Sequence, residues 1–203
     1  MGYRLWVIGL AILLGMGAYA ADSTKVEKNP IYGGMTLKFD VGAAALTPAL
    51  NKGRLQQYEL AMNWQVINRL YPTLELGYAG GKATRGDSLS YNDFGGYFRA
   101  GLDINPLKKH PESPHAMLIG IRVGTDFQPK RIDCWGEIVA GCQVQLAQVG
   151  KTGFYMGWMG RLKILFTRKD GQTADEMAPI YIPGFGKRGN VAWGLSYHVG
   201  WKF

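Results

Sequence analysis

The sequence has little cysteine and no long apolar run after its first residues, and both absences limit the fold. A membrane-spanning helix needs about 20 consecutive apolar residues, and polar residues, charges or glycine interrupt every later stretch before that length. Only Cys134 and Cys142 are available for disulfide bonds. Basic residues never run longer than two together, so nucleic acid is not an expected partner.

The chain also lacks the residue patterns of common catalytic and metal sites. It has no metal-ligand spacing, no glycine-rich phosphate loop and no nucleophile motif. A barrel enzyme that modifies lipids would need a histidine with a serine or acidic partner near its outer rim. His110 and His115 fall in a polar turn segment, and His198 falls near the end of the last strand segment. We therefore expect a non-enzymatic protein with no metal and no cofactor.

Residues 1–20 have the pattern of a secretory signal peptide. Arg4 precedes an apolar stretch from Leu5 to Met16, and Ala18-Tyr19-Ala20 provides a small-residue cleavage site. Cleavage there removes one basic and no acidic residue, so the formal charge falls from +8 to +7. The mature part, residues 21–203, suits one domain. Its modest positive charge favours phosphate-bearing lipid headgroups as partners.

From Ile31 onward, apolar and polar residues alternate with the period of two that is typical of β-strands. The clearest segment runs from Val191 to Phe203, where apolar or aromatic residues alternate with small or polar ones. The same pattern predicts strands within 35–41, 57–66, 74–79, 98–104, 117–127 and 154–166. A weaker segment from Pro179 to Phe185 contains two prolines, and we expect it to form a short or irregular strand.

These eight segments predict an all-β fold, an eight-stranded antiparallel up-and-down transmembrane β-barrel. Bacterial outer-membrane barrels have an even number of strands, which is why the weak segment is counted. In this order, residues 67–72, 105–116 and 168–178 would be periplasmic turns. Residues 42–54, 81–93, 128–151 and 184–190 would be outer loops.

A soluble β-sandwich would show the same alternation, with the apolar face buried in one core. Aromatic residues near both ends of the apolar face favour lipid instead, because outer-membrane barrels have aromatic girdles at both interfaces. We expect Phe154 near the same rim as Phe39 and Trp193, and Phe166 near the other rim with Trp64 and Trp201. The predicted girdle is Phe39, Tyr58, Trp64, Tyr78, Phe127, Phe154, Phe166, Trp193, Trp201 and Phe203.

The opposite face of the predicted strands carries charges of both signs. An eight-stranded barrel is just wide enough for its side chains to fill, and buried charges need partners. We therefore expect a plugged lumen with a paired charge network, and a narrow or gated pore for small solutes is the alternative. The predicted network is Lys38, Asp40, Glu59, Glu75, Arg99, Asp103, Arg122, Asp126, Arg161 and Lys163.

Several motifs resemble those of known outer-membrane proteins. The last residues, Tyr197 to Phe203, resemble the C-terminal signature whose final aromatic residue is read by the barrel-assembly machinery. Tyr32-Gly33-Gly34, Glu75 to Tyr78, Tyr97 to Asp103, Tyr155 to Trp158 and Pro183 to Lys187 resemble a Bacteroidetes family of outer-membrane β-barrels, a domain of unknown function similar in architecture to small eight-stranded outer-membrane proteins. The resemblance implies the fold and the cell outer membrane, and it brings no catalytic residues.

The predicted outer loops hold basic residues and the two cysteines. We expect Cys134 and Cys142 to form a disulfide that braces the loop 128–151. Ordinary solvated loop charge is one reading of the basic residues, and contact with phosphates of outer-leaflet lipid is the other. The candidate headgroup-binding residues are Lys52, Arg54, Lys82, Arg85, Lys130, Arg131, Lys187 and Arg188.

Taken together, these features predict a structural or interaction protein of the outer membrane. Its loops would bind lipid headgroups, a partner protein or an external ligand. A small-solute channel and a lipid-modifying barrel enzyme are the competing classes.

Overall fold

The computed structural model describes residues 34–42, 55–66, 69–85, 89–107, 115–128, 132–150, 152–166 and 181–203, with side chains in all of these ranges except 82–85 and 89–93. The predicted signal peptide and the headgroup candidates Lys52, Arg54, Lys130 and Arg131 lie outside the described residues.

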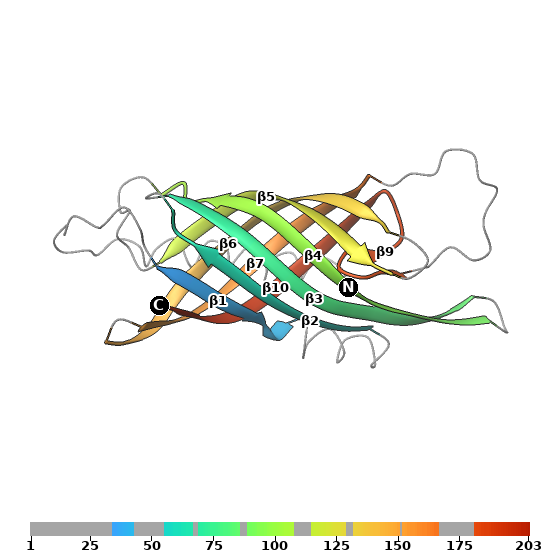
Figure 1. Cartoon of the computed structure of the whole chain (residues 1–203), viewed down its shortest axis with the longest axis horizontal. Helices are drawn as coiled ribbons and strands as arrows, with labels where there is room; N and C mark the ends of the chain where they lie inside the picture. Colours follow the sequence, from blue (N-terminus) through green and yellow to red (C-terminus); the bar gives the residue numbers. More distant parts are fainter. Residues whose placement is uncertain are drawn as a thin grey trace, which may run out of the picture.

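Eight strands form one closed antiparallel barrel, in which β1 pairs with β10 to complete the circle (Figure 1). The strands are β1 (Met35–Asp40), β2 (Leu55–Trp64), β3 (Leu70–Arg85), β4 (Leu89–Ile104), β5 (Ala116–Phe127), β6 (Cys134–Val149), β7 (Thr152–Leu165) and β10 (Val191–Lys202). A separate small hairpin consists of β8 (Tyr181–Ile182) and β9 (Gly186–Lys187). The predicted all-β, eight-stranded antiparallel barrel is confirmed. Among the described residues, no helix is long and apolar enough to cross a membrane.

The barrel is narrow and its strands are strongly staggered. Following the strand pairs once around from Leu37 through β2 to β7 leads to Val191 on β10, whereas the direct partner of Leu37 on β10 is Trp201. The stagger is therefore the ten residues from Val191 to Trp201. In a barrel of eight strands this stagger tilts the strands and leaves an interior that side chains can fill.

The alternation along each strand divides the residues between the two faces of the barrel. On β5, for example, the even-numbered positions from Leu118 to Asp126 are buried, and Met117, Ile119, Ile121 and Val123 are exposed. The period of two puts successive side chains on opposite faces, so one face of the closed sheet must line the lumen. The charged residues take that face.

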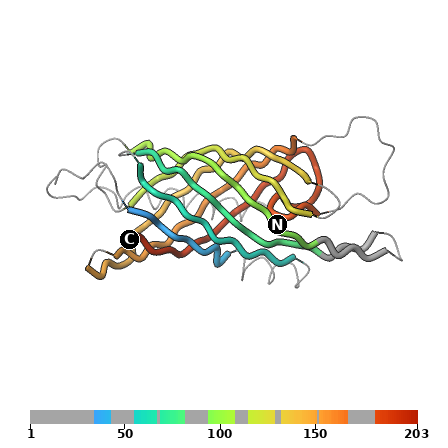
Figure 2. The backbone as a smooth tube through the Cα atoms, viewed as in Figure 1, coloured from blue at the N-terminus to red at the C-terminus, as the bar shows by residue number. Residues whose placement is uncertain are grey.

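Two hairpins extend past the rest of the barrel, at opposite ends (Figure 1). The β3–β4 pairing continues to Arg85 and Leu89, beyond the last β2–β3 pair at Leu55 and Gly81. Residues 81–93, predicted as a loop, therefore mostly extend these two strands. Figure 2 shows the β6–β7 hairpin projecting at the other end, beside the C terminus.

The prediction that residues 128–151 form an outer loop is wrong. Most of this segment is β6, which pairs with β5 and β7 along its length. The prediction that Pro179 to Phe185 supplies a barrel strand is also wrong, because its described part belongs to the small β8–β9 hairpin. One strand was missed and one was wrongly counted, so the total of eight was unaffected.

Because β6 was not predicted as a strand, β7 was expected to run in the direction opposite to the one it has. Phe154, at the start of β7, lies at the end of the barrel that holds the C-terminus, with its ring centroid 5.5 Å from that of Trp201. Phe166 follows β7 at the opposite end. The expected rims of these two residues are therefore exchanged. The connection from β7 to β10 also leaves from that opposite end, whereas residues 168–178 were predicted as a periplasmic turn; they lie outside the described residues.

Candidate functional site in the barrel lumen

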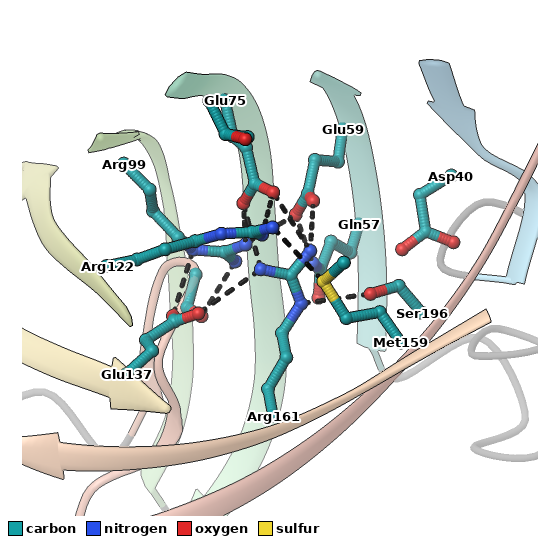
Figure 3. A network of polar contacts seen from close by, with 12 residues as sticks. Asp40, Gln57, Glu59, Glu75, Arg99, Arg122, Glu137, Met159, Arg161 and Ser196 are labelled. Atoms are coloured by element: carbon teal, nitrogen blue, oxygen red, sulfur yellow. Dashed lines mark hydrogen bonds and ion pairs between the residues drawn. The ribbon is translucent and has the colours of Figure 1, made fainter. Parts of the chain in front are cut away.

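The centre of the lumen holds a cluster of seven charged residues that ion pairs connect (Figure 3). We call it the charge cluster. Its members are Arg99, Arg122, Arg161, Glu59, Glu75, Asp103 and Glu137, and all are buried. Each side chain comes from an inward position on β2 to β7, so the alternation of the strands brings together residues that are far apart in the sequence.

Arg99 and Arg161 each bind the same three glutamates. Arg161 lies 2.9 Å from a carboxylate oxygen of Glu59, 2.9 Å from one of Glu75 and 3.2 Å from one of Glu137. Arg99 lies 2.9, 2.6 and 3.0 Å from oxygens of the same residues. Planar guanidinium groups suit this arrangement because their five N–H donors can serve several carboxylates at once.

Arg122 extends the cluster toward the end that holds the C-terminus. It pairs with Glu75, and its Nη2 lies 2.9 Å from Asp103 Oδ2. The Thr73 hydroxyl donates to that same Asp103 oxygen at 3.1 Å. Three guanidinium groups thus face four carboxylates in the cluster. Such charges stay stably buried only with close partners of opposite sign.

Sequence reasoning missed two residues of this site. Glu137 lies on β6, in the segment predicted as a loop. Tyr97 is fully buried, and its hydroxyl donates to Glu59 at 2.6 Å and accepts from Gln57 Nε2 at 2.9 Å. Its position two residues before Arg99 on the same strand was a usable signal, since i and i+2 share a face.

The other four predicted network residues are also buried at the lumen. They are Lys38, Asp40, Asp126 and Lys163, and three of them form hydrogen bonds with backbone groups. Asp40 accepts from the Tyr197 N–H at 3.2 Å, and Asp126 accepts from the Asp133 N–H at 2.6 Å. Lys163 donates to the carbonyl oxygen of Gly184 at 2.5 Å. Lys38 lines a cavity described below. All ten predicted residues therefore lie inside, and six of them belong to the charge cluster.

The segment from Tyr181 to Lys187 fills the lumen on the side of the charge cluster away from the C-terminus, and we call it the plug hairpin. Ile182 and Phe185 are almost fully buried and pack with Ala79, Tyr97 and Trp135. The ring of Phe185 meets that of Trp135 edge to face, with centroids 6.1 Å apart. Residues 184–190 were predicted as an outer loop, but Gly184 and Phe185 lie inside the barrel.

A polar cavity lies on the other side of the charge cluster. Its volume is ≈ 20 Å³, which is room for about one water molecule. Residues of the cluster line it together with Lys38, Asp40, Ser196 and His198. Along the barrel axis, the lumen therefore contains first the plug hairpin, then the charge cluster and then this small cavity.

The outer face of the barrel is apolar. The ten predicted girdle residues all lie on it. Trp64, Phe154, Trp201 and Phe203 are near the end with the C-terminus, Phe39 is about midway, and the other five are toward the opposite end. Between these ends the outer face carries aliphatic residues such as Leu76, Ile121, Ile138 and Leu195, all exposed.

The predicted disulfide is wrong. Cys134 and Cys142 both lie on β6, and no disulfide joins them. Eight residues of extended strand separate their Cα atoms by about 26 Å, whereas a disulfide requires less than about 7 Å. The sequence spacing suggested a ring in a loop, but the segment is a straight strand.

The four headgroup candidates within the described ranges belong to connections at the end of the barrel away from the C-terminus. Lys82 and Arg85 lie on the β3 extension, where no side chains are described. Lys187 is exposed on the plug hairpin. Arg188 lies 3.6 Å from the buried carboxylate of Asp133.

Of the two histidines in the described part of the chain, one is exposed and the other lies in the lumen. His115 is exposed near the β6–β7 hairpin, and its Nδ1 accepts from the Gln145 N–H at 3.2 Å. His198 is buried in the lumen beside the polar cavity. Over the described ranges, no group of three or more histidine, cysteine or acidic side chains could hold a metal ion.

Comparison with known proteins identifies a family. The model of a family described as a domain of unknown function, DUF6048, matches residues 16–133 and 129–202. These matches cover most of the chain. No curated protein and no solved structure matches it significantly.

Proposed function

The chain belongs to the DUF6048 family, and on that premise we propose that it is a non-enzymatic outer-membrane β-barrel protein with a structural or interaction role. The observation that carries this proposal is the inverted distribution of its side chains. Leu195 and Ile121 on the outer face are 75% and 67% exposed, whereas Arg99 and Asp103 inside are 0% exposed. A protein surrounded by water buries its apolar side chains and exposes its charges.

A lipid bilayer accounts for this inversion. Hydrocarbon tails cover an apolar outer face without a second layer of protein, and a closed barrel leaves no unpaired strand edge in lipid. A tilted strand needs about 9 to 11 residues to cross, and β5 and β10 have 12 residues each. Aromatic residues toward both ends suit the two interfaces of a membrane. We propose the outer membrane of a Gram-negative bacterium of the Bacteroidetes as the location.

The filled lumen supports a structural or interaction role over the alternative of a pore. Small solutes would have to pass the plug hairpin and then the charge cluster, and the cavity beyond them holds about one water molecule. The surfaces available for a partner protein or an external ligand are then the connections between strands. The outward aromatic residues from Tyr197 to Phe203, at the end of β10 and directly after it, support recognition by the barrel-assembly machinery during insertion.

Tryptophan quenching by brominated phospholipids tests the membrane proposal. Two single-tryptophan variants of the mature chain, one keeping Trp193 and one keeping Trp135, are refolded into vesicles with bromine on the acyl chains. Trp193 is 80% exposed on the outer face and Trp135 is fully buried inside, so only the first should be strongly quenched. A chain that stays in the aqueous phase, with neither tryptophan quenched, would contradict the proposal.

We also propose that basic residues at the end away from the C-terminus contact phosphates of outer-leaflet lipid. The test is a variant in which Lys82, Arg85, Lys187 and Arg188 are all replaced by glutamine. It should copurify with less phosphorylated glycolipid and lose part of its resistance to heating in detergent. Arg69→Gln, at the opposite end, is the control and should change neither property. Unchanged lipid content in the fourfold variant would end this part of the proposal.

A further inference from the structure

Two buried cationic groups converge on one neutral oxygen of the plug hairpin. The carbonyl oxygen of Gly184 lies 2.5 Å from Lys163 Nζ and 3.1 Å from Arg99 Nη2. Lys163 also lies 3.3 Å from the carbonyl oxygen of Phe185. Two positive donors aimed at one point are the arrangement that binds a carboxylate or phosphate oxygen. Here a backbone carbonyl takes that position.

No carboxylate of the described residues forms an ion pair with Lys163, although the side chain is buried. Its register partner on β6 is Glu137. That carboxylate instead forms an ion pair with Arg99 and accepts hydrogen bonds from Arg161 and the Trp135 indole. The nearest partners of Lys163 Nζ are therefore carbonyl oxygens, and Glu137 acts on it as a more distant counter-charge. A charge–dipole contact in a low-dielectric interior is weaker than a charge–charge contact, so an oxyanion would be the better partner.

The walls around this point are aromatic and apolar. Tyr97 and Trp135 are fully buried and pack against Ile182 and Phe185 of the plug hairpin. If the hairpin left the lumen, these rings would form a pocket whose floor is Lys163 and Arg99. The charge cluster below would still close the lumen, so the result would be a blind pocket open at one end and not a pore.

Little backbone pairing holds the plug hairpin in place. Each of its strands has two residues, and they pair only with each other. Gly184, between them, has a φ of +76°, and a Cβ at this position would lie 2.5 Å from Cγ of the Tyr97 ring. The seated position therefore depends on one glycine in close contact with one ring.

We propose that the plug hairpin is a built-in occupant of a binding site for small molecules that join a carboxylate or phosphate group to an aromatic or apolar body. The Gly184 carbonyl substitutes for the oxyanion, and Phe185 substitutes for the body against Trp135. Ligand and hairpin compete for the same place, so binding releases the hairpin. This site is independent of the proposed membrane role, and its test succeeds or fails separately.

Chymotrypsin cleavage after Phe185 measures release of the hairpin in the intact folded protein. Phe185 is 1% exposed when seated, so cleavage between Phe185 and Gly186 requires the hairpin to leave the lumen. Mass spectrometry of the fragments identifies that cut. Cleavage of the wild type in detergent should be slow, and Gly184→Val should accelerate it about tenfold or more, because the side chain collides with Tyr97. Gly160→Val is the matched control, since its Cβ faces open space except for the Ala140 carbonyl oxygen at 3.6 Å.

Benzoate and phenyl phosphate are the probes for the ligand class, with benzyl alcohol as the uncharged control. Each oxyanion should accelerate cleavage after Phe185 in the wild type, and the stronger of the two identifies the carboxylate or the phosphate as the preferred group. Benzyl alcohol should have no such effect. Lys163→Met should loosen the hairpin and abolish the response to both oxyanions. The proposal is overturned if Gly184→Val leaves the rate of cleavage unchanged. It is also overturned if the oxyanions accelerate cleavage of the wild type no more than benzyl alcohol does, or if they accelerate cleavage of Lys163→Met as much as that of the wild type.

Discussion

Arg161 on β7 and Glu75 on β3 stand on diametrically opposite strands of the barrel, yet their side chains lie 2.9 Å apart. The sequence separation of this pair is 86 residues. One ion pair therefore spans the full width of the lumen. It follows that the centre of the barrel is two side chains wide, and that each charge there depends on partners from the far wall.

Replacing Arg161 by methionine should destabilise the folded barrel by about 3–5 kcal/mol, because three buried glutamates lose a shared cation. Methionine is shorter than arginine but keeps most of its volume, so the effect reports the charge more than a cavity. The measurement is denaturant unfolding in vesicles followed by tryptophan fluorescence. Lys187→Met removes an exposed lysine and should change the stability by less than about 0.5 kcal/mol.

The double variant Arg161→Met with Glu75→Met provides a further control. Removing both partners should cost less than the sum of the two single substitutions, because neither charge is then left uncompensated by the other. Strict additivity of the two changes would contradict a direct interaction across the lumen.

The sequence predicts the fold well because, in most strands, apolar residues on one face alternate strictly with polar or small residues on the other. Glu75 and Arg99 were assigned inward from alternation alone, and both are buried in the lumen. Alternation fixes the face of a residue, but it contains no information about register. It therefore could not indicate that Arg161 reaches Glu59 and Glu75, since those contacts depend on the stagger of ten residues around the barrel.

On β6 this alternation of apolar and polar residues is lost, and the structure gives the physical reason. Its inward positions include Trp135 and Val139, which are apolar because they pack against Phe185 and Met159 inside the barrel. Its outward positions include Gly136 and Ala140, which are small. Both faces are thus mixed, and two cysteines suggested a loop. A plug inside a barrel places apolar residues on the face where alternation expects polar ones.

Ile121→Arg should destabilise the protein in vesicles by about 2–4 kcal/mol, because it places a charge against the hydrocarbon at the midplane of the bilayer. Ile121 lies in the middle of β5 and its side chain points outward. Val149→Arg is the matched control, because Val149 is just as exposed but lies at the tip of the β6–β7 hairpin. Its cost should be about 0–1 kcal/mol. Equal and small costs at both positions would indicate that water, not lipid, surrounds the outer face.

Both cysteines should be present as thiols in the purified protein. Alkylation of the unfolded chain without reductant should add two alkyl groups, because Cys134 and Cys142 are held apart on one straight strand. Intact-mass spectrometry measures this directly. A protein two hydrogens lighter that takes up no alkyl group would show that β6 is not continuous between these residues.

Adding one methyl group at Gly77 should destabilise the barrel by about 1–3 kcal/mol through overpacking. A Cβ at Gly77 would collide with the Tyr97 ring, which is fully buried and hydrogen-bonded to Glu59, so the ring cannot easily move away. Gly160→Ala adds the same group on the outer face of β7, where only the Ala140 carbonyl oxygen is near, at 3.6 Å. That substitution should be neutral or slightly stabilising, because alanine restricts the unfolded chain more than glycine does. Denaturant unfolding of the two variants side by side separates the effects, and equal stabilities would mean that Tyr97 does not pack over Gly77.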